Sequence, residues 1–506
     1  MSSSRTKNVS INMVTALFCQ VVNLCLNFVS RTYFIQALGA EYLGVNGLFS
    51  NVLSILSFAE LGIGNALVFS MYKPLAVGDH QKLTSLMALY KKAYRIIALV
   101  VAVTGLLYIP FMEYTIKDHP NIPENLYIIY LLFLCNTVVS YLVVYKKSII
   151  TADQKNYIVL IASEIPHIIQ IVAQIAVLII YHSFIGFLVI QIAFTFVGNL
   201  ACAIIANKKY PYILNKPDPL DKEERSEIFR NIRSMAMYKF GSIILNGTDN
   251  IIISTLLGVI PVGIVSNYVL FYQAANSVIG NILNSFTASI GNLNAIASPE
   301  KKYDIFKKVL FITVWLYGFT ASALVVLSQI LIPLWVGVDY LLDLPTVIAI
   351  MSGFYVFGVH TAESHYRMTM GYFVKGKMAP LYSAILNIVL SVALCKWIGL
   401  IGVFIATPIS RIVFIGIVDT KLIYQLGFGK NPLQYYYVNF GYLLLIVLLS
   451  LIAYYCLDLI QVDGWHGLLI KTVVFTIIFN FSMYLIFCRT KMFREILGMA
   501  KSVLKH

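Results

Sequence analysis

Long apolar runs separated by short polar breaks recur along the whole chain. A transmembrane helix needs about 20 predominantly apolar residues, and runs of this length follow one another with only short connections. The pattern therefore predicts a polytopic helical membrane protein. The expected spanning helices are fourteen in number and cover residues 10–36, 42–72, 93–112, 125–145, 157–181, 183–206, 236–258, 262–290, 309–337, 343–370, 379–395, 398–420, 435–457 and 466–488.

The composition agrees with this interpretation and excludes other classes. Of the 506 residues, 59% are apolar and only 12% are charged, which is more apolar surface than a soluble globule hides. The seven cysteines lie within or at the ends of apolar runs and have no metal-ligand spacing, so we expect neither a disulfide framework nor a zinc site. The fold class that we predict is all-α and membrane-spanning.

Basic residues gather in alternate connections between the predicted spans. The net charge is +14, and most of the cations share a side with Arg5 and Lys7, which precede the first span. Acidic residues collect on the opposite side. Because cationic loops stay in the cytoplasm, both termini are expected there. The positive surplus is thus explained by membrane topology, and no nucleic-acid partner is expected.

The chain contains an internal repeat. Leu38-Gly39, followed by Gly44, recurs as Leu257-Gly258 followed by Gly263, a shift of 219 residues. A repeat of this kind predicts two parallel six-helix lobes with a substrate site between them and alternating access by rocking. The expected parts are an N-lobe (1–207), a linker (208–235) with a short surface helix over 220–233, a C-lobe (236–424), two further spans (425–488) and an amphipathic cytoplasmic tail (489–506).

Several segments resemble bacterial polysaccharide repeat-unit flippases of the Wzx type. The matching stretches are Ser30-Arg31, Tyr42-Leu43-Gly44, Ala59-Glu60-Leu61-Gly62-Ile63-Gly64, Tyr72-Lys73-Pro74-Leu75 and Thr248-Asp249-Asn250-Ile251-Ile252-Ile253-Ser254. These flippases belong to the MOP exporter superfamily, together with MATE exporters and the lipid II flippase MurJ.

The resemblance implies a substrate, a place and partners. The substrate would be an undecaprenyl-diphosphate-linked oligosaccharide, carried from the inner to the outer leaflet through a central cavity for capsule or other surface polysaccharide biosynthesis. The place would be the bacterial cytoplasmic membrane. Membrane lipids and the polymerase and glycosyltransferases of the same pathway would be its partners.

Cations within the spans are candidates for binding the diphosphate. An ionisable side chain inside the membrane costs about 2.5–3.5 kcal/mol and usually faces a cavity or a partner. Arg31 lies about 12 Å before Gly39 at helical rise, and a diphosphate contact is favoured over snorkelling to the interface. First-helix arginines also line the cavity of the lipid II flippase, which resembles this position. The predicted diphosphate-binding residues are Arg31, Lys146, Lys239, Arg367 and Arg411. For Lys146 and Arg367, snorkelling into the inner leaflet is the favoured interpretation, and admission of the diphosphate from the cytoplasmic side is the alternative.

Acidic residues within the spans are candidates for ion coupling or gating. Glu60, Asp249 and Glu164 could each bind a coupling H⁺ or Na⁺, and the membrane potential is a further source of energy. Structural roles stay open as well: Asp249 could pair with Arg31, and the Glu60 carboxylate could bond to backbone at the Gly62-Ile63-Gly64 break.

No motif for metal binding or catalysis is present in the sequence. His360 and His365 flank Glu363 but are five residues apart, whereas zinc-binding pairs on a helix use a spacing of four, so we reject a metal site. No cofactor and no enzymatic activity are expected. The alternatives are a lipid II-type or multidrug exporter of the same fold and, in another class, a membrane polysaccharide polymerase or glycosyltransferase, which would carry a large external loop.

Overall fold

The structure is a computed structural model that describes residues 2–60, 63–117, 120–370, 372 and 376–504. Side chains are described in these ranges except at 2–10, 13, 58–59, 65–66, 224, 227, 231–242, 245–246, 284–296 and 499–504. Every regular element in the described ranges is helical. Contacts divide the chain into an N-terminal unit (Met1–Gly263) and a C-terminal unit (Ile264–His506).

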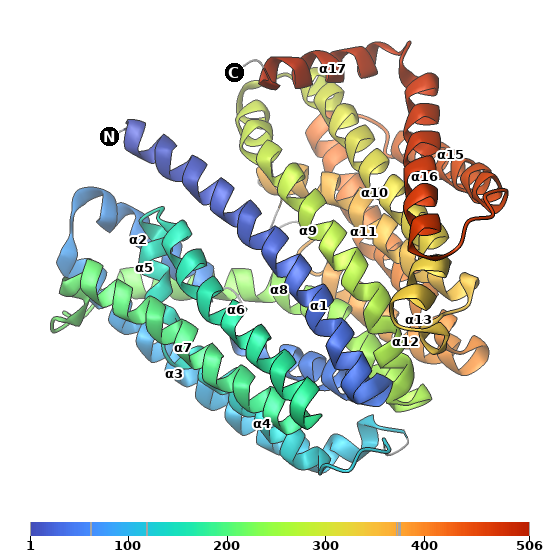
Figure 1. The fold of residues 1–506 in the computed structure, drawn as a ribbon. Helices are drawn as coiled ribbons and strands as arrows, with labels where there is room; N and C mark the ends of the chain where they lie inside the picture. Colours follow the sequence, from blue (N-terminus) through green and yellow to red (C-terminus); the bar gives the residue numbers. More distant parts are fainter. Residues whose placement is uncertain (1, 61–62, 118–119, 371, 373–375, 505–506) are drawn as a thin grey trace. The chain divides into compact units, whose positions relative to one another are not determined.

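The N-terminal unit is a bundle of long helices (Figure 1). Its helices α6 and α7 lie side by side, α1 packs on α6 and α8, and α4 packs on α3 and α7. The elements are α1 (Ser2–Leu56), η1 (Ser57–Glu60), α2 (Ile63–Val77), α3 (His80–Tyr108), η2 (Ile109–Thr115), α4 (Leu126–Leu142), η3 (Val144–Lys146), α5 (Lys147–Ala152), α6 (Asn156–Tyr181), α7 (Phe184–Lys209), η4 (Pro211–Leu214) and α8 (Lys222–Leu257).

The C-terminal unit is built mainly around α10, which contacts α11, α15, α16 and α17. The helices α12 and α13 form an adjoining antiparallel pair, and α13 also packs on α11. The elements are α9 (Val259–Ile296), whose first residues up to Gly263 belong to the N-terminal unit, α10 (Pro299–Trp335), η5 (Val338–Tyr340), α11 (Leu344–Thr369), α12 (Ala379–Ile398), α13 (Leu400–Ser410), η6 (Arg411–Gly416), α14 (Ile417–Lys421), η7 (Leu422–Phe428), α15 (Leu433–Asp458), α16 (Gly464–Phe487) and α17 (Lys491–Leu504).

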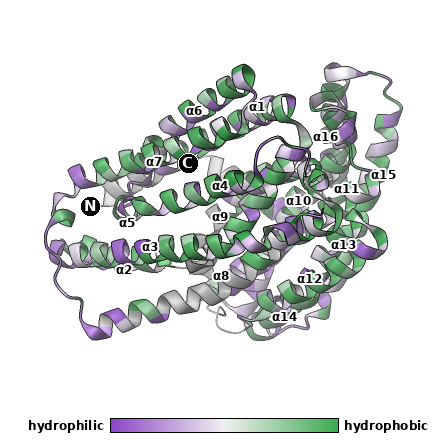
Figure 2. Ribbon diagram, turned by 90° about the horizontal axis from the view of Figure 1, so that it is seen from below, coloured by the Kyte–Doolittle hydropathy of each residue, from purple (hydrophilic) through white to green (hydrophobic). Residues whose placement is uncertain are grey.

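Each predicted span falls on a helical part of the chain, which confirms the predicted fold class. Figure 2 shows apolar residues along the helices and hydrophilic residues at their ends and connections. Among the described residues, eleven helices are long and apolar enough to cross a membrane. The first predicted span and the start of the second lie on α1, which has a break at Gly39, and α8 and α9 are not among the eleven. The number fourteen stays a prediction.

The predicted surface helix before the seventh span differs from the structure. Instead of a separate helix over 220–233, α8 runs without interruption from Lys222 to Leu257. No Pro or Gly occurs in residues 222–240, so nothing in the local sequence ends the helix once it has begun. The contacts also group α8 with the N-terminal unit, whereas the sequence assigns residues 236–258 to the second lobe.

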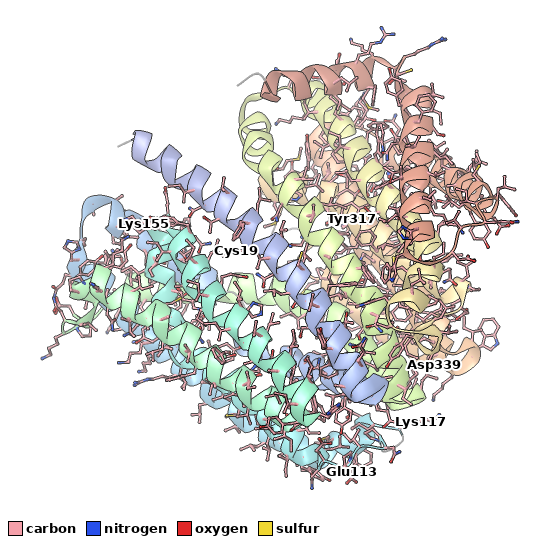
Figure 3. The ribbon with its side chains drawn as sticks, viewed as in Figure 1. Cys19, Glu113, Lys117, Lys155, Tyr317 and Asp339 are labelled. Carbon is pink, nitrogen blue, oxygen red and sulfur yellow. The ribbon has the colours of Figure 1, made fainter. Side chains whose placement is uncertain are left out.

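Charges at the two ends of the N-terminal unit agree with the asymmetry in the sequence. Figure 3 shows Lys155 at one end of the unit and Glu113 at the other. Glu113 accepts a hydrogen bond of 2.7 Å from the Tyr127 hydroxyl. Lys117, one of the few cations predicted on the acidic side, lies near the Glu113 end. That the Lys155 end is cytoplasmic stays a prediction.

The amphipathic tail forms a helix, α17, that lies across the end of α10 and α16 (Figure 1). Phe493 is buried and its ring stacks on Trp315 at 5.8 Å between centroids. On the same helix, Glu495 pairs with the Lys308 ammonium of α10 at 2.6 Å. One apolar and one ionic contact thus hold the tail against the C-terminal unit.

The two copies of the repeat meet at a close backbone crossing. Gly39 has φ 86° and Gly258 has φ 95°, a region that glycine enters without strain, so both copies break at equivalent positions. Just after these breaks, a Cβ atom on Gly44 would lie 1.9 Å from the carbonyl oxygen of Val259, and one on Gly263 would lie 2.3 Å from that of Ala40. The two contacts are related by the repeat shift of 219 residues.

This crossing predicts that a methyl group is not tolerated at Gly44 or Gly263. Because the obstructing atom is a backbone oxygen, Gly44→Ala and Gly263→Ala should each destabilise the protein by about 1–3 kcal/mol. Thermal unfolding of the purified protein in detergent would show the loss as a lower Tm. The matched control is Gly280→Ala on α9, where no atom lies within 4 Å of the added Cβ. Equal Tm values for all three variants would contradict the crossing.

Candidate functional site

A buried group of charged side chains lies between α11 and α14. It consists of His360, Glu363 and Arg367 from α11 and Asp419 from α14, and we call it the charged cluster. Spacings of three and four residues place the α11 members on one face of that helix. Their residues are 9%, 0% and 2% exposed, and Asp419 is 1% exposed. The cluster is therefore part of the interior of the C-terminal unit.

Every member of the charged cluster lies within ion-pair distance of another ionisable side chain of the cluster. Arg367 Nη1 donates to Asp419 Oδ1 at 2.6 Å, and Arg367 Nε donates to the carbonyl oxygen of Tyr372 at 3.2 Å. The His360 ring lies between the two acids, with Nδ1 at 2.5 Å from Glu363 Oε2 and Nε2 at 3.2 Å from Asp419 Oδ2. The Thr420 hydroxyl completes the group by donating to Glu363 Oε1 at 2.5 Å.

The backbone around Asp419 is irregular. The helix α14 has five residues and is flanked by two π-helical segments, η6 before it and η7 after it. Such segments are rare in helices and are frequent at functional sites. The acid that joins the cluster from this side is therefore carried by a short piece of regular helix between two irregular ones.

Arg411, the first residue of η6, lies inside the same unit. It is 8% exposed, and its guanidinium carbon is 4.9 Å from the centroid of the Phe357 ring on α11. A desolvated cation–π contact of this kind stabilises by about 2 kcal/mol. Arg411 and Arg367 are thus both interior residues of the C-terminal unit. Arg367 is 2% exposed, which differs from the position of a side chain that snorkels to the membrane interface.

The cations predicted in the first half lie at different levels of the N-terminal unit. Arg31 is half-buried in the middle of α1. Lys146 lies at the end of η3, and its ammonium donates to Asn207 Oδ1 on α7 at 2.8 Å. The side chain of Lys239 lies outside the described part of the chain. The binding of a diphosphate by these residues stays a prediction.

Two of the three candidate gating acids have described hydrogen bonds. Glu164 Oε2 on α6 accepts from the Asn23 amide of α1 at 2.9 Å, while its buried Oε1 has no hydrogen-bond partner among the described residues. Glu60 lies in η1, at the break between α1 and α2, and its Oε1 accepts from the Tyr94 hydroxyl at 3.1 Å. The described partner of Glu60 is thus a side chain of α3, while Gly62 of the predicted backbone contact lies outside the described residues. Asp249 is half-buried on α8, and its pairing with Arg31 stays a prediction.

Asp419 and the joint role of His360 and Glu363 are not predicted from the sequence. The spacing of His360, Glu363 and Arg367 on one face of a helix was the available signal. Asp419 falls at the end of the predicted span 398–420, where an acid is compatible with the membrane interface. In the described part of the chain, no three His, Cys, Asp or Glu side chains are grouped as metal ligands.

The chain is similar in fold to solved membrane transporters. It matches the lipid II flippase MurJ in an inward closed conformation, with a TM-score of 0.63, 15% identity and coverage of 94% of this chain and 98% of that chain. It also matches an inward-facing multidrug resistance MATE family transporter of the MOP superfamily, with a TM-score of 0.62, 14% identity and coverage of 80% and 96%. The chain thus shares its fold with these transporters.

A third transporter structure has a similar fold. The Vibrio cholerae MATE transporter VcmN matches with a TM-score of 0.54, 13% identity and coverage of 83% of this chain and 97% of that chain. No protein-family model and no curated protein sequence matches the chain. The comparisons therefore identify a multi-pass membrane fold shared with these transporters, and the roles of side chains in it have to be argued from this chain.

The charged cluster predicts strong coupling between Arg367 and Asp419. Removing one partner of a buried ion pair leaves an uncompensated charge and costs about 3–5 kcal/mol. Asp419→Asn and Arg367→Gln should therefore each lower the Tm of the purified protein strongly. The double variant should cost less than the sum of the single variants. Lys377→Gln, which alters an exposed cation after α11, is the control. Additive effects, or single variants as stable as the control, would show that the pair is not coupled.

Proposed function

We propose that this protein is a flippase that moves an undecaprenyl-diphosphate-linked oligosaccharide from the inner to the outer leaflet of the membrane. The observation that carries the proposal is the match with a lipid II flippase over 94% of this chain and 98% of that chain. A lipid II flippase handles a lipid-linked substrate, and segments of this sequence resemble flippases for polysaccharide repeat units. The biological role would be surface polysaccharide biosynthesis.

Arg31 is the first candidate for contact with the diphosphate. A guanidinium group offers paired N–H donors that fit phosphate oxygens, and the half-buried side chain of Arg31 lies in the middle of a membrane-spanning helix. Lys146 and Lys239 would assist from positions nearer the cytoplasmic ends of their spans. Arg367 and Arg411 are buried within the C-terminal unit, so they would reach the substrate only after a rearrangement of that unit.

The transport cycle would use the two halves as alternating gates. The diphosphate head is drawn to the cations while the prenyl chain stays in the lipid. Because strong phosphate contacts would also hold the substrate back, release needs a compensating change in charge. Binding of H⁺ or Na⁺ at Glu60, Asp249 or Glu164, or the membrane potential, would supply it.

The charged cluster favours an anionic over a cationic substrate. A multidrug exporter for cationic compounds would benefit from exposed acids, but Glu363 and Asp419 are occupied by His360 and Arg367. These two carboxylates are therefore not available to bind a cationic substrate.

A reconstituted flipping assay tests the proposal. Proteoliposomes carrying a labelled undecaprenyl-diphosphate oligosaccharide on one leaflet are treated with a membrane-impermeant glycosidase, which measures the substrate that has crossed. The full chain should raise the crossing rate at least tenfold over empty liposomes. Arg31→Gln should lower the initial rate about tenfold because it removes a charged hydrogen-bond donor, and Arg31→Lys should be intermediate.

The control is Lys377→Gln, which should flip at the wild-type rate. Absence of flipping by a folded wild-type protein would overturn the proposal, and uptake of a cationic dye in the same liposomes would favour the exporter. Formation of a longer glycan by the purified chain would favour the polymerase. Wild-type rates in Arg31→Gln would remove Arg31 from the binding site while leaving the activity.

A further inference from the structure

Both ring nitrogens of His360 face carboxylate oxygens. Nδ1 is 2.5 Å from Glu363 Oε2 and Nε2 is 3.2 Å from Asp419 Oδ2. A neutral imidazole donates from one nitrogen and presents a lone pair at the other. With both nitrogens against acids, that lone pair would face a carboxylate oxygen. The Nε2 contact is a hydrogen bond, whereas the Nδ1 contact is an ion-pair distance, and Glu363 Oε2 accepts no hydrogen bond among the described residues. Two short contacts to carboxylates therefore fit a protonated, positively charged imidazolium ring.

The charges of the cluster balance only when it holds this proton. Arg367 keeps its charge at all relevant pH values, and it contributes one positive charge against the two carboxylates. Protonated His360 brings the sum to zero, whereas loss of the proton leaves one negative charge in the interior of the unit, which is costly. One H⁺ thus decides whether the cluster is neutral.

The surrounding helices supply no second cation to the cluster among the described residues. From α15 and η7, the phenols of Tyr435, Tyr436 and Tyr424 lie near Glu363. On α10, Lys308 pairs with Asp304 at 2.6 Å and with Glu495 of α17. On η6, Arg411 lies over the Phe357 ring. The groups that act on His360 itself are Glu363 and Asp419.

The backbone that carries Asp419 can respond to a change in charge. Each π-helical turn holds an extra residue, and moving the chain by one residue in an α-helix rotates the following side chains by about 100°. The helix α14 lies between two such segments. A conversion of η6 to regular helix would therefore turn Asp419 and Thr420 away from α11.

We propose that His360, Glu363 and Asp419 form a proton-binding site of the C-terminal unit, which takes up and releases one H⁺ in each transport cycle. With the proton bound, Asp419 bridges His360 and Arg367 and holds α14 against α11. After its release, the excess negative charge favours the turned register of α14, so the proton biases a two-state element. That this drives substrate movement rests on the proposed function; the binding of the proton does not.

Proton occupancy is measured directly on the full chain in lipid bilayers. With ¹⁵N-labelled histidine, solid-state NMR should show one ring with both nitrogens protonated at pH 7, and His360→Gln should remove this signal. As the pH is raised, the ring should convert to the neutral form. The matched control is His365→Gln on the same helix, which should leave the signal in place. In Glu363→Gln the doubly protonated fraction at pH 7 should fall at least threefold, and Asp419→Asn should do the same if it folds.

Coupling is measured in the flipping assay with an imposed pH gradient. A gradient of one pH unit should change the wild-type and His365→Gln rates at least threefold, and the rate of His360→Gln should not respond. A His360 ring that is neutral at pH 7, or that stays charged from pH 5 to 10, would overturn the proton site and leave a fixed ion-pair cluster. A titrating His360 with gradient-independent flipping would overturn the coupling. No flipping by wild type would refute the proposed function, while the NMR result would still decide the proton site.

Discussion

Charge inside a membrane-embedded bundle has to be neutralised where it is buried, and the interior of the C-terminal unit depends on this constraint. Arg367 and Asp419 are each almost completely buried, and in that setting either charge alone would be far less favourable than the pair. His360 and Glu363 extend the pair into a group whose charges balance only with one additional proton. The packing of α14 on α11 and the protonation of the cluster are therefore a single equilibrium rather than two independent properties.

The glycine crossing is the second constraint, and it gives the internal repeat a physical meaning. Gly44 meets the backbone of Val259 and Gly263 meets the backbone of Ala40, so each copy of the repeat supplies one glycine and one carbonyl. Small residues permit such close approach of helices in membranes. A side chain at either position would separate the two segments, which explains why the same glycines occur at one shift along the sequence.

The sequence predicts the parts of this fold that depend on local hydropathy and repeats. It does not predict contacts between side chains that are far apart in the sequence. Hydropathy predicts spans that fall on helical parts of the chain, and the repeat pairs Gly39 with Gly258, where the structure has its breaks. The pairing of Asp419 with Arg367 is not visible, because periodicity of 3.6 residues does not describe the π-helical segments that set the direction of Asp419. The charged composition of residues 220–233 is typical of a separate surface helix. Because no residue there ends the helix, α8 continues from Lys222 to Leu257. Diphosphate binding by Arg31 is a matter of affinity, which a fold alone does not reveal.

The repeat also shows how the two halves have diverged in their use of charge. The pair Tyr145-Lys146 recurs as Tyr366-Arg367 at a shift of 221 residues, close to the shift of 219 between the glycines, so Lys146 and Arg367 lie at corresponding places in the repeat. Lys146 donates to the neutral amide of Asn207, and among the described residues no carboxylate lies within ion-pair distance of it, whereas Arg367 is bound to Asp419. The charge of Lys146 in the first half is therefore open to an anionic headgroup. In the second half, the equivalent charge of Arg367 is paired with Asp419, and a proton on the cluster neutralises the remaining acid. Such a division fits a transporter in which one half attracts a diphosphate and the other responds to a proton.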